Sequence, residues 1–447
     1  MSDRVLSGWG RTAPSAARVV PARAPQAVAD TVRGEPSLIA RGLGRSYGDP
    51  AQNAGGAVLD CTSLDGPVDV DPSAGTVTAE AGVSLDALMR LLLPQGWFVP
   101  VTPGTRQVTV GGAIANDIHG KNHHCDGSFG HALVSLDLVL ASGETITVSP
   151  DARPDVFWAT VGGLGLTGII TRATFRVLPV ETASMVVDTE RAPDLDSCMA
   201  AMVEGDAHYP YSVAWIDLLA SGARMGRSVL TRGRHATALE AGRKAATGAF
   251  QPSTLARVPF RAPNGLLNRA TVRAFNEVWF RKAPRRRIDE VQPLAAFFHP
   301  LDIADDWNLL YGSRGFLQWQ CVLPDEAADV MRSVVATLSS SGIASFLAVL
   351  KRMGPTSPGH LSFPMPGWTL ALDMPVGRPD LGPLLDDLDD RVADAGGRIY
   401  LAKDSRARPA TIARMYPRLA EWQRVVAEVD PHGRFQSDLS RRLHLRG

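Results

Sequence analysis

A glycine-rich stretch, PGTRQVTVGGAIANDIHGKNHHCDGSFG at residues 103–130, restricts most strongly what this sequence can form. Six glycines surround a segment, VTV, whose β-branched residues predict a short strand. Glycine at this density indicates a backbone that turns at positive φ or approaches another group closely. Gly111 and Gly112 would expose successive backbone N–H groups after the strand, which suits a phosphate group. A tight loop without a ligand is the alternative.

The length and charge of the chain limit its class. With 447 residues it is too long for one ordinary core, so two domains are expected. Basic and acidic residues both total 46, and the resulting net charge of zero argues against nucleic acid as the main partner. The four cysteines show no CxxC pair, which disfavours a disulfide framework. We find neither an apolar secretory signal at the N-terminus nor an apolar run of transmembrane length.

A second glycine-rich segment, ARGLGRSYGDPAQNAGG at residues 40–56, follows the short strand expected at residues 37–39. Its glycines alternate with Arg41, Arg45, Ser46 and Tyr47, so the loop could wrap a pyrophosphate. The Asp-Pro pair that follows predicts a turn, and no helix is expected directly after it.

The elements around these loops can be read from their patterns. Residues 76–81 alternate as in a strand, and Ser84 is placed to cap a helix that Pro94 would end. Residues 134–148 predict a hairpin that turns at Ser142-Gly143. Residues 163–168 spell G-x-G-x-x-G, but the alternating IITRATFRVL after them predicts a strand instead of the helix that a dinucleotide-binding fold requires.

From about residue 182 the pattern changes to alternating strands followed by helices, which predicts a second, α+β domain. Within it, residues 255–288 are rich in Pro and Arg, with apolar residues between the basic ones. We expect a mobile segment there, either a solvated loop or a basic lid that touches an anionic lipid or membrane surface. Near the C-terminus, residues 397–401 predict a strand that delivers Lys403 to a loop.

Several common reaction centres are disfavoured. His119, His123, His124 and Cys125 lie close in sequence, but Gly120 interrupts helical spacing and no carboxylate stands at ligand spacing, so no metal site is expected. The G-x-S-x-G motif of serine hydrolases and the G-x-x-x-x-G-K-[ST] phosphate loop are both absent. Three glycine-rich turns, one His-Gly and one late lysine suit a large diphosphate cofactor that itself carries redox chemistry.

The segment TVTAEAGVSLDALMRLLLPQGWFVPVTPGTRQVTVGGAIANDIHG resembles the FAD-binding domain of the vanillyl-alcohol-oxidase-type flavoproteins. More closely, ARGLGRSYGD, DIHGKNHH, FFHPLD and AKDSR resemble the actinobacterial decaprenylphosphoryl-β-D-ribose 2-oxidases, over nearly the whole chain. The resemblance implies an α+β fold of two domains, a PCMH-type FAD-binding domain and a substrate domain with an antiparallel sheet. The expected parts are residues 1–181 and 398–447 for FAD, and residues 182–397 for the substrate.

The activity that the resemblance implies is oxidation of the 2-hydroxyl of a polyprenylphosphoryl-β-D-ribose to a ketone. A short-chain NAD(P)-dependent reductase would then complete epimerisation to the arabinose donor of cell-wall arabinan. The resemblance also suggests a periplasmic or cell-envelope location, whereas the sequence by itself suggests a cytoplasmic or membrane-associated protein. A sugar-alcohol or aldonolactone oxidase and a non-enzymatic flavin- or lipid-binding protein are the alternatives.

The site residues carried over from the family fall into two groups. The FAD-binding residues would be Ala40, Arg41, Gly42, Leu43, Gly44, Arg45, Ser46, Tyr47, Gly48, Asp49, Pro50, Gly104, Thr109, Val110, Gly111, Gly112, Asn116, Asp117, Ile118, His119, Ile170 and Tyr400. The substrate would meet Lys121, Trp215, Tyr311, Gln318, Gln320, Lys351 and Lys403. Tyr47 stands where covalent flavoproteins of the wider group often carry histidine, so FAD is expected to be noncovalent.

The chain departs from the family at one strand. Best-known members have Asn and Cys after a Gly-Trp pair, whereas Thr369 and Ala371 follow Gly367-Trp368 here. The change puts capture of covalent inhibitors in doubt, but not the oxidation, because hydride transfer needs no thiol. We expect Lys403 to be a cation that stabilises charge on the reduced flavin, and His119 to orient flavin or substrate. Tyr47, Lys403 and His119 all remain open as acceptor of the hydroxyl proton.

Overall fold

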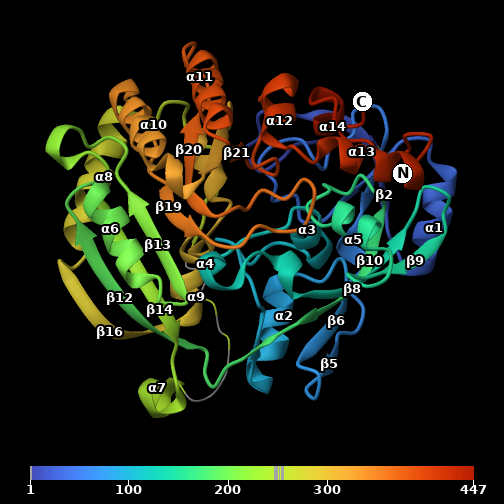
Figure 1. Cartoon of the computed structure of the whole chain (residues 1–447), viewed down its shortest axis with the longest axis horizontal. Helices are drawn as coiled ribbons and strands as arrows, with labels where there is room; N and C mark the ends of the chain where they lie inside the picture. Colours follow the sequence, from blue (N-terminus) through green and yellow to red (C-terminus); the bar gives the residue numbers. More distant parts are fainter. Residues whose placement is uncertain (1–2, 246–249, 251, 253–255) are drawn as a thin grey trace.

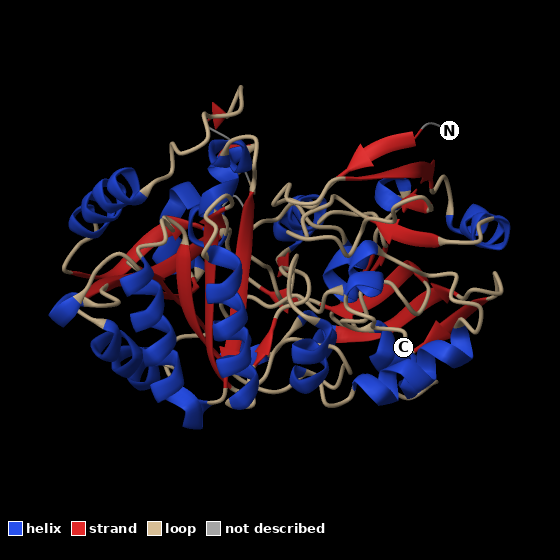
Figure 2. Ribbon diagram, turned by 90° about the horizontal axis from the view of Figure 1, so that it is seen from above, coloured by secondary structure: helices blue, strands red, loops and turns tan. Residues whose placement is uncertain are grey.

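The computed structural model describes residues 3–245, 250, 252 and 256–447. Its sheets form two groups at opposite ends of the long axis (Figure 1), and both groups are also separate when the molecule is seen from above (Figure 2). Two smaller sheets, whose strands lie between residues 3 and 176, and a two-stranded pair of residues 97–98 with 178–179 make up the first group. One eight-stranded sheet makes up the second.

The first group begins with a four-stranded sheet in the order β1-β2-β4-β3, on which helix α1 packs. Its neighbour is a five-stranded, fully antiparallel sheet in the order β5-β6-β10-β8-β9. The strands are β1 Asp3–Leu6, β2 Ser15–Pro21, β3 Leu38–Arg41, β4 Ala57–Asp60, β5 Asp69–Asp71, β6 Thr76–Glu80, β8 Leu133–Val139, β9 Thr145–Val148 and β10 Ile169–Arg176, and α1 is Pro25–Gly34.

Short helices between these strands fill the core of the first group. Ser84 caps α2, where its Oγ accepts a hydrogen bond from the Ala87 N–H at 3.1 Å, and the helix buries four apolar side chains against the five-stranded sheet. The remaining elements of this region are α2 Leu85–Leu92, β7 Trp97–Phe98, α3 Val110–Ala115, α4 His123–Asp126, α5 Pro154–Thr160 and β11 Leu178–Pro179.

The second group is one antiparallel sheet in the order β16-β12-β14-β13-β19-β20-β18-β21. Helices α6, α10 and α11 cover one of its faces in Figure 1. The elements are β12 Ser184–Ala192, α6 Leu195–Gly205, β13 Tyr211–Ile216, β14 Ser228–His235, α7 Ala238–Ala245, β15 Ala256–Arg257, α8 Arg269–Lys282, β16 Arg286–Pro293, α9 Leu294–Phe298, β17 Ala304–Asp305, β18 Phe316–Leu323, α10 Ala328–Ser341, β19 Ala348–Met353, β20 Gly367–Pro375, α11 Leu381–Asp394 and β21 Arg398–Ile399.

Side chains alternate across this sheet with the period of two that strands impose. On β18, Trp319 and Cys321 belong to the core beneath the helices, while Gln318 and Gln320 face the opposite side. The same alternation on β19 sends Lys351 to that opposite side. The face turned away from the helices therefore presents polar groups toward the first group of sheets.

After β21 the chain returns to the first group. Helices α12 (Pro409–Met415), α13 (Leu419–Val429) and α14 (Asp438–Arg442) follow, and Phe435 bridges to Leu38 of β3. Arg442 on α14 pairs with Asp49 at 2.7 Å and with Asp404 at 2.9 Å, which fixes the glycine-rich loop at residues 40–56 against the Lys403 turn. The C-terminal segment thus closes over the loops predicted to bind a cofactor.

Most of the element predictions are confirmed. The 134–148 hairpin is β8–β9, and strand β10 follows Gly168, as the argument against a dinucleotide-binding fold required. The VTV strand is wrong, because Thr109 caps α3 and its Oγ1 accepts from the Gly112 N–H at 3.2 Å. Part of residues 255–288 is helix α8, capped by Asn268; Leu255 lies outside the described residues. In the described part of the chain, no helix is both long and apolar enough to span a membrane.

Candidate active site

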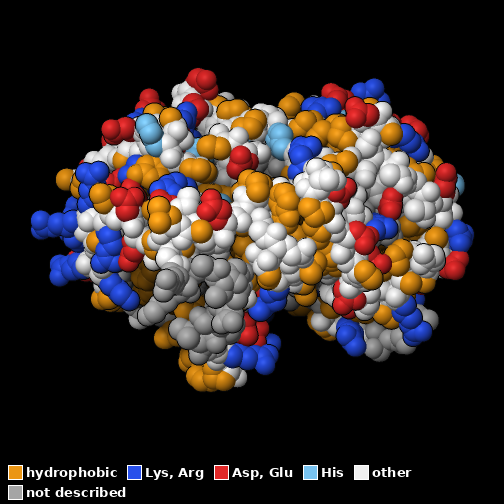
Figure 3. Space-filling model, turned by 90° about the horizontal axis from the view of Figure 1, so that it is seen from below, with side chains coloured by type: hydrophobic (Ala, Val, Ile, Leu, Met, Phe, Trp, Pro, Cys, Tyr) orange, Lys and Arg blue, Asp and Glu red, His pale blue; other side chains and the backbone are white. Residues whose placement is uncertain are grey.

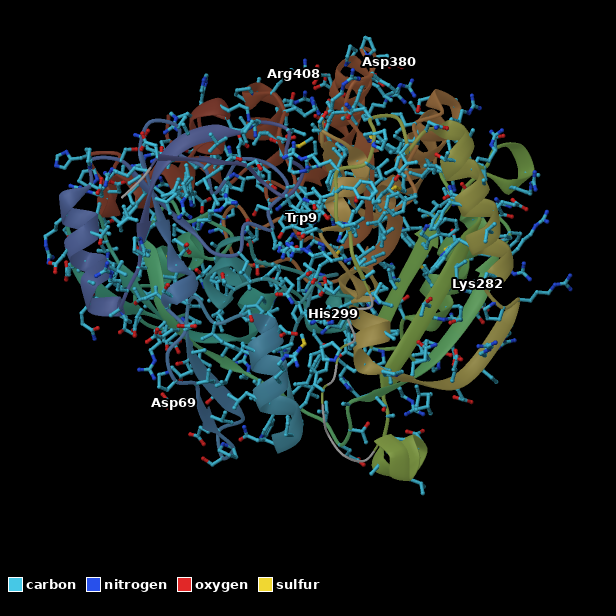
Figure 4. The ribbon with its side chains drawn as sticks, turned by 180° about the vertical axis from the view of Figure 1, so that it is seen from behind. Trp9, Asp69, Lys282, His299, Asp380 and Arg408 are labelled. Atoms are coloured by element: carbon cyan, nitrogen blue, oxygen red, sulfur yellow. The ribbon has the colours of Figure 1, made fainter. Side chains whose placement is uncertain are left out.

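A large cavity of about 1240 Å³ lies between the two groups of sheets. The glycine-rich loops of the first group form one wall, and the polar face of the eight-stranded sheet forms the other. In Figure 4, Trp9 and His299 mark the middle of the molecule between these walls, whereas Lys282 stands at the outer edge. The volume exceeds the range typical for one drug-sized ligand, so the cavity has room for a large cofactor and a substrate together.

Most residues expected to bind a cofactor do line this cavity. Seventeen of them form its wall: Ala40, Gly42, Leu43, Gly44, Arg45, Ser46, Tyr47, Pro50, Gly104, Thr109, Gly111, Gly112, Asn116, Ile118, His119, Ile170 and Tyr400. Five others support the wall from behind: Arg41, Gly48, Asp49, Val110 and Asp117.

The two glycine-rich loops touch where glycine is required. A Cβ on Gly42 would lie 2.3 Å from Thr109 Oγ1, so only glycine permits this approach. The predicted phosphate cradle at Gly111-Gly112 is wrong, because both N–H groups already have partners. Gly111 donates to the Ala81 carbonyl at 2.8 Å, and Gly112 donates to the Thr109 hydroxyl.

Tyr47 and Lys403 meet where the walls join. The Tyr47 N–H donates to the Ala402 carbonyl at 3.0 Å, and a Cβ on Gly48 would lie 1.8 Å from the Asp404 oxygen. The Lys403 ammonium lies 3.9 Å from the centre of the Tyr47 ring, a cation–π contact. Asp404 pairs with Arg442 and not with Lys403. A surface ion pair with Asp404 therefore does not explain the presence of Lys403.

Burial changes the proton affinity of both residues. It raises the pKa of Tyr47 well above its usual value, so the phenol keeps its proton near neutral pH. It lowers the pKa of Lys403 to about 8, although the Asp373 carboxylate opposes part of the shift. Lys403 can therefore exchange a proton near neutral pH, which an ordinary lysine does not.

His119 is a buried, neutral imidazole. Its Nε2 lies 2.9 Å from the Gln320 amide nitrogen, which can only donate, so the ring proton belongs on Nδ1. That Nδ1 has no hydrogen-bond partner among the described residues. Burial, followed by the charge of Lys351, holds the pKa of His119 well below its usual value. The cavity thus contains a fixed N–H donor that suits a ligand acceptor.

The expected substrate residues come mainly from the sheet wall. Lys121, Trp215, Gln318, Gln320, Lys351 and Lys403 all border the cavity. The Trp215 indole donates to the Phe346 carbonyl at 3.0 Å, and Gln320 also donates to the Thr369 hydroxyl at 3.1 Å. Tyr311 does not belong to the wall, because it stacks on Phe316 at 4.1 Å and is buried behind it.

Sequence reasoning missed Asp373, a fully buried carboxyl on β20. Gln318 donates to its Oδ1, and the neighbouring Tyr311 hydroxyl also interacts with the carboxyl. Burial raises the pKa of Asp373 to about 7, against the opposing effects of Gln318 and Lys403. Strand alternation places Asp373 on the same side as Ala371, which borders the cavity, and this spacing could have indicated it.

The cavity fits FAD better than a metal. In the parts of the chain that the structure describes, no group of three His, Cys, Asp or Glu side chains is placed to hold a metal ion. Arg45 Nε, Asn116 Oδ1 and His119 Nδ1 are buried polar atoms without a hydrogen-bond partner among the described residues, and all three residues line the cavity. Unpaired groups of this kind suit a large ligand with many donors and acceptors, such as FAD.

A rim around helix α8 borders the outer part of the cavity. Phe275 and Trp279 stack with ring centres 6.0 Å apart, and both line the cavity while each remains 43% exposed. Basic side chains of the neighbouring strand β16 are exposed beside them. Figure 3 shows Lys and Arg side chains gathered at the left edge of the molecule, where α8 and β16 lie in Figure 1.

Comparison with known proteins agrees with this geometry. Residues 16–149 match the family model described as an FAD binding domain. The chain is 46% identical over 450 residues to the decaprenylphosphoryl-β-D-ribose oxidase of Mycolicibacterium smegmatis, an alignment that covers 98% of this chain and 97% of that protein. A Streptomyces coelicolor protein, named only for its place in the mprA 5′ region, is 41% identical over 81% of this chain and its own full length. The D-arabinono-1,4-lactone oxidase of Yarrowia lipolytica is 36% identical over 24% of this chain and 20% of that protein.

Proposed function

The chain belongs to the decaprenylphosphoryl-β-D-ribose oxidase family, and on this basis we propose that it oxidises the 2-hydroxyl of a polyprenylphosphoryl-β-D-ribose to the 2-keto sugar. It is an FAD-dependent oxidoreductase. The ketone would be the first half of an epimerisation that yields the arabinose donor for cell-wall arabinan. A short-chain NAD(P)-dependent reductase is the proposed partner for the second half.

The observation that carries this proposal is the junction of Tyr47 and Lys403 between the two cavity walls. It brings a lysine with a pKa of about 8 to the place where the FAD-binding loops meet the polar sheet face. Oxidation of an alcohol removes one hydride and one proton from the CH–OH group. FAD, when bound, supplies the hydride acceptor, so the protein has to receive the proton.

Lys403 is the group we assign to that proton. Of the three acceptors left open by the sequence, Tyr47 has a raised pKa that disfavours the phenolate, and Gln320 occupies the acceptor nitrogen of His119. Neutral Lys403 takes the hydroxyl proton on Nζ and becomes an ammonium in the same step. The new positive charge stabilises the negative charge that develops in the cavity, as preorganised electrostatic groups do.

The remaining polar groups orient the sugar. The Gln318 amide nitrogen donates to Asp373, and the Gln320 amide nitrogen donates to His119 and Thr369. The amide oxygens of both glutamines are left as acceptors for sugar hydroxyls. His119 contributes the Nδ1–H donor described above. These fixed positions hold the reacting carbon without further reorganisation.

Product analysis with matched substrates tests the proposal. Purified protein is incubated with farnesylphosphoryl-β-D-ribose, with its 2-deoxy analogue and with D-arabinono-1,4-lactone, and products are identified by mass spectrometry after borodeuteride reduction. We expect deuterium at C2 of the ribosyl product alone. Oxidation of the lactone at a comparable rate would favour the alternative aldonolactone oxidase, and no oxidation of any sugar would favour a non-enzymatic flavin protein.

A further inference from the structure

Lysine is used sparingly in this chain. Only five of its 46 Lys and Arg residues are lysines. Four of them, Lys121, Lys282, Lys351 and Lys403, border the large cavity, and the side chain of Lys244 lies outside the described part. In that part, the ion pairs are made by arginines and in one case by His360, and none involves these four lysines. In the described part of the chain, lysine is therefore concentrated at the cavity, which Arg45 and Arg257 also border.

Lys121 and Lys351 stand next to each other in the cavity wall. The Lys351 ammonium donates to the Gly120 carbonyl at 3.3 Å, one residue before Lys121. The Lys121 ammonium donates to the Phe297 carbonyl and lies 4.3 Å from the centre of the Phe297 ring. An ammonium carries three N–H donors, so each lysine keeps donors that can be directed at a ligand.

The charges around this pair favour an anion. Burial, followed by the charge of Lys351, lowers the pKa of Lys121 to about 7. Burial, followed by the charge of Lys403, lowers the pKa of Lys351 to about 7. The other titratable groups that face the pair are His119, His123 and His299, whose own pKa values burial lowers.

No carboxylate among the described residues lies within ion-pair distance of either lysine. The Asp373 carboxyl interacts electrostatically with Lys403 and not with this pair. Two neighbouring buried cations without a counterion are unfavourable in an empty cavity, and an anion that binds both removes the conflict.

We propose that Lys121 and Lys351 form an anion subsite that binds the phosphodiester of the substrate. The natural occupant rests on the proposed function: the phosphate on C1 of the sugar is one carbon from the 2-hydroxyl that is oxidised. The position on the sheet wall, beside Trp215 and Gln320, favours a substrate phosphate over the FAD diphosphate, which is the other source of the same chemistry. Arginine would hold an anion as well, but only lysine changes its charge on binding.

The subsite has a measurable consequence, because an anion restores protons to the two lysines. At pH 8 both are mostly neutral in the free protein, so binding must take up protons from the solution. Titration calorimetry in buffers of different ionisation enthalpy measures that uptake on the FAD-loaded protein. Two probes that are never oxidised are used: diethyl phosphate, and the 2-deoxyribosyl farnesyl phosphodiester.

We expect net proton uptake with both probes. Lys121→Met/Lys351→Met should lose the uptake and bind the diesters about tenfold or more weakly, since a hydrogen bond to a charged group is removed at each site. Lys282→Met, at the exposed rim, is the matched control and should keep the uptake. Lys351→Arg, which is always charged, should bind but take up fewer protons, and it serves if the double variant does not fold.

Binding without proton uptake, or uptake that persists in the double variant, would overturn the subsite. The double variant could instead lose FAD easily and yet, when reloaded with FAD, bind the diesters as tightly as the parent protein. That result would assign the two lysines to the cofactor diphosphate and would also overturn the subsite. Diethyl phosphate carries neither sugar nor prenyl chain, so its binding reports the subsite even if the sugar proposed as substrate is wrong.

Discussion

At the scale of single residues, the position of Lys403 can be predicted from the sequence only in part. Its place after a short strand was predicted from sequence, but its contact with Tyr47 at 3.9 Å depends on the close approach of Gly48 to the Asp404 backbone, which joins distant parts of the chain. Tyr311 was expected at the substrate and is instead buried behind Phe316. Asp373 was missed because a single acid in an apolar strand gives no sign of its neighbours until the sheet order is known.

Replacing Lys403 tests its assigned role. Lys403→Ala should fold and bind FAD, yet reduce it on the order of a hundredfold more slowly with substrate, because the acceptor of the hydroxyl proton is removed. Lys403→Arg should recover little of the rate, because the guanidinium stays protonated and cannot accept the hydroxyl proton. Anaerobic stopped-flow absorbance measures the rate. A Lys403→Ala rate within about threefold of the parent, far short of that scale, would make Lys403 a structural residue.

The pH dependence follows from the Asp373–Lys403 pair. Because neutral Lys403 is the acceptor and its pKa is about 8, the rate of flavin reduction should rise through pH 8 and level off above it. Asp373→Asn removes the negative neighbour that raises the pKa of Lys403, so the rise should move to lower pH. A rate that falls through pH 8 would show that the charged lysine is the active form. A pH profile that does not move in Asp373→Asn would show that Asp373 does not set the pKa of Lys403.

At the scale of elements, hydrophobic periodicity predicted the regular strands and helices and failed at the glycine-rich loops. The VTV segment looks like a strand by residue type, but Thr109 ends it as a helix cap. Helix α8 is not predicted from the sequence, because Pro and Arg flank it and its apolar residues do not form a single face. Val272 is buried on the inner side of α8, while Phe275 and Trp279 turn toward the cavity mouth and solvent.

The α8 rim makes membrane contact testable. Half of the exposed large apolar side chains of the described residues, including Phe260, Phe275 and Trp279, lie between residues 260 and 291 beside exposed arginines. We expect Phe275→Ser/Trp279→Ser to reduce cosedimentation with phosphatidylglycerol vesicles severalfold, since apolar insertion and charge attraction both contribute. Val203→Ser, an exposed residue on α6, is the control. Equal binding by both variants, or none by the parent, would refute a membrane-facing rim.

At the scale of the whole molecule, the α+β class and the change of sequence pattern near residue 182 are predicted from the sequence. Along the chain, β12 is indeed the first strand of the eight-stranded sheet. We propose the domain division 1–181 and 398–447 against 182–397. The mobility expected for residues 255–288 does not extend to Arg286 and Arg287, which pair with β12 in the eight-stranded sheet. The cavity itself could not be predicted, because it exists only between elements that are hundreds of residues apart, such as Tyr47 and Lys403.

At the same scale, we predict that FAD is bound without a covalent link to the chain. Tyr47 offers a buried phenol with a raised pKa at the loop position, and no imidazole. Acid denaturation of the purified protein should therefore release all flavin into the supernatant, measured by its absorbance. Flavin that remains with the precipitated chain after washing would show a covalent link through another residue.

Anaerobic titration of the purified, FAD-loaded protein with farnesylphosphoryl-β-D-ribose tests the central claim most directly. The account predicts that the flavin absorbance bleaches fully with one equivalent of substrate per flavin, that the 2-deoxy analogue binds without bleaching, and that free polyols leave the spectrum unchanged. A flavin that stays oxidised with the ribosyl phosphodiester, or that bleaches equally with the 2-deoxy analogue, would contradict it.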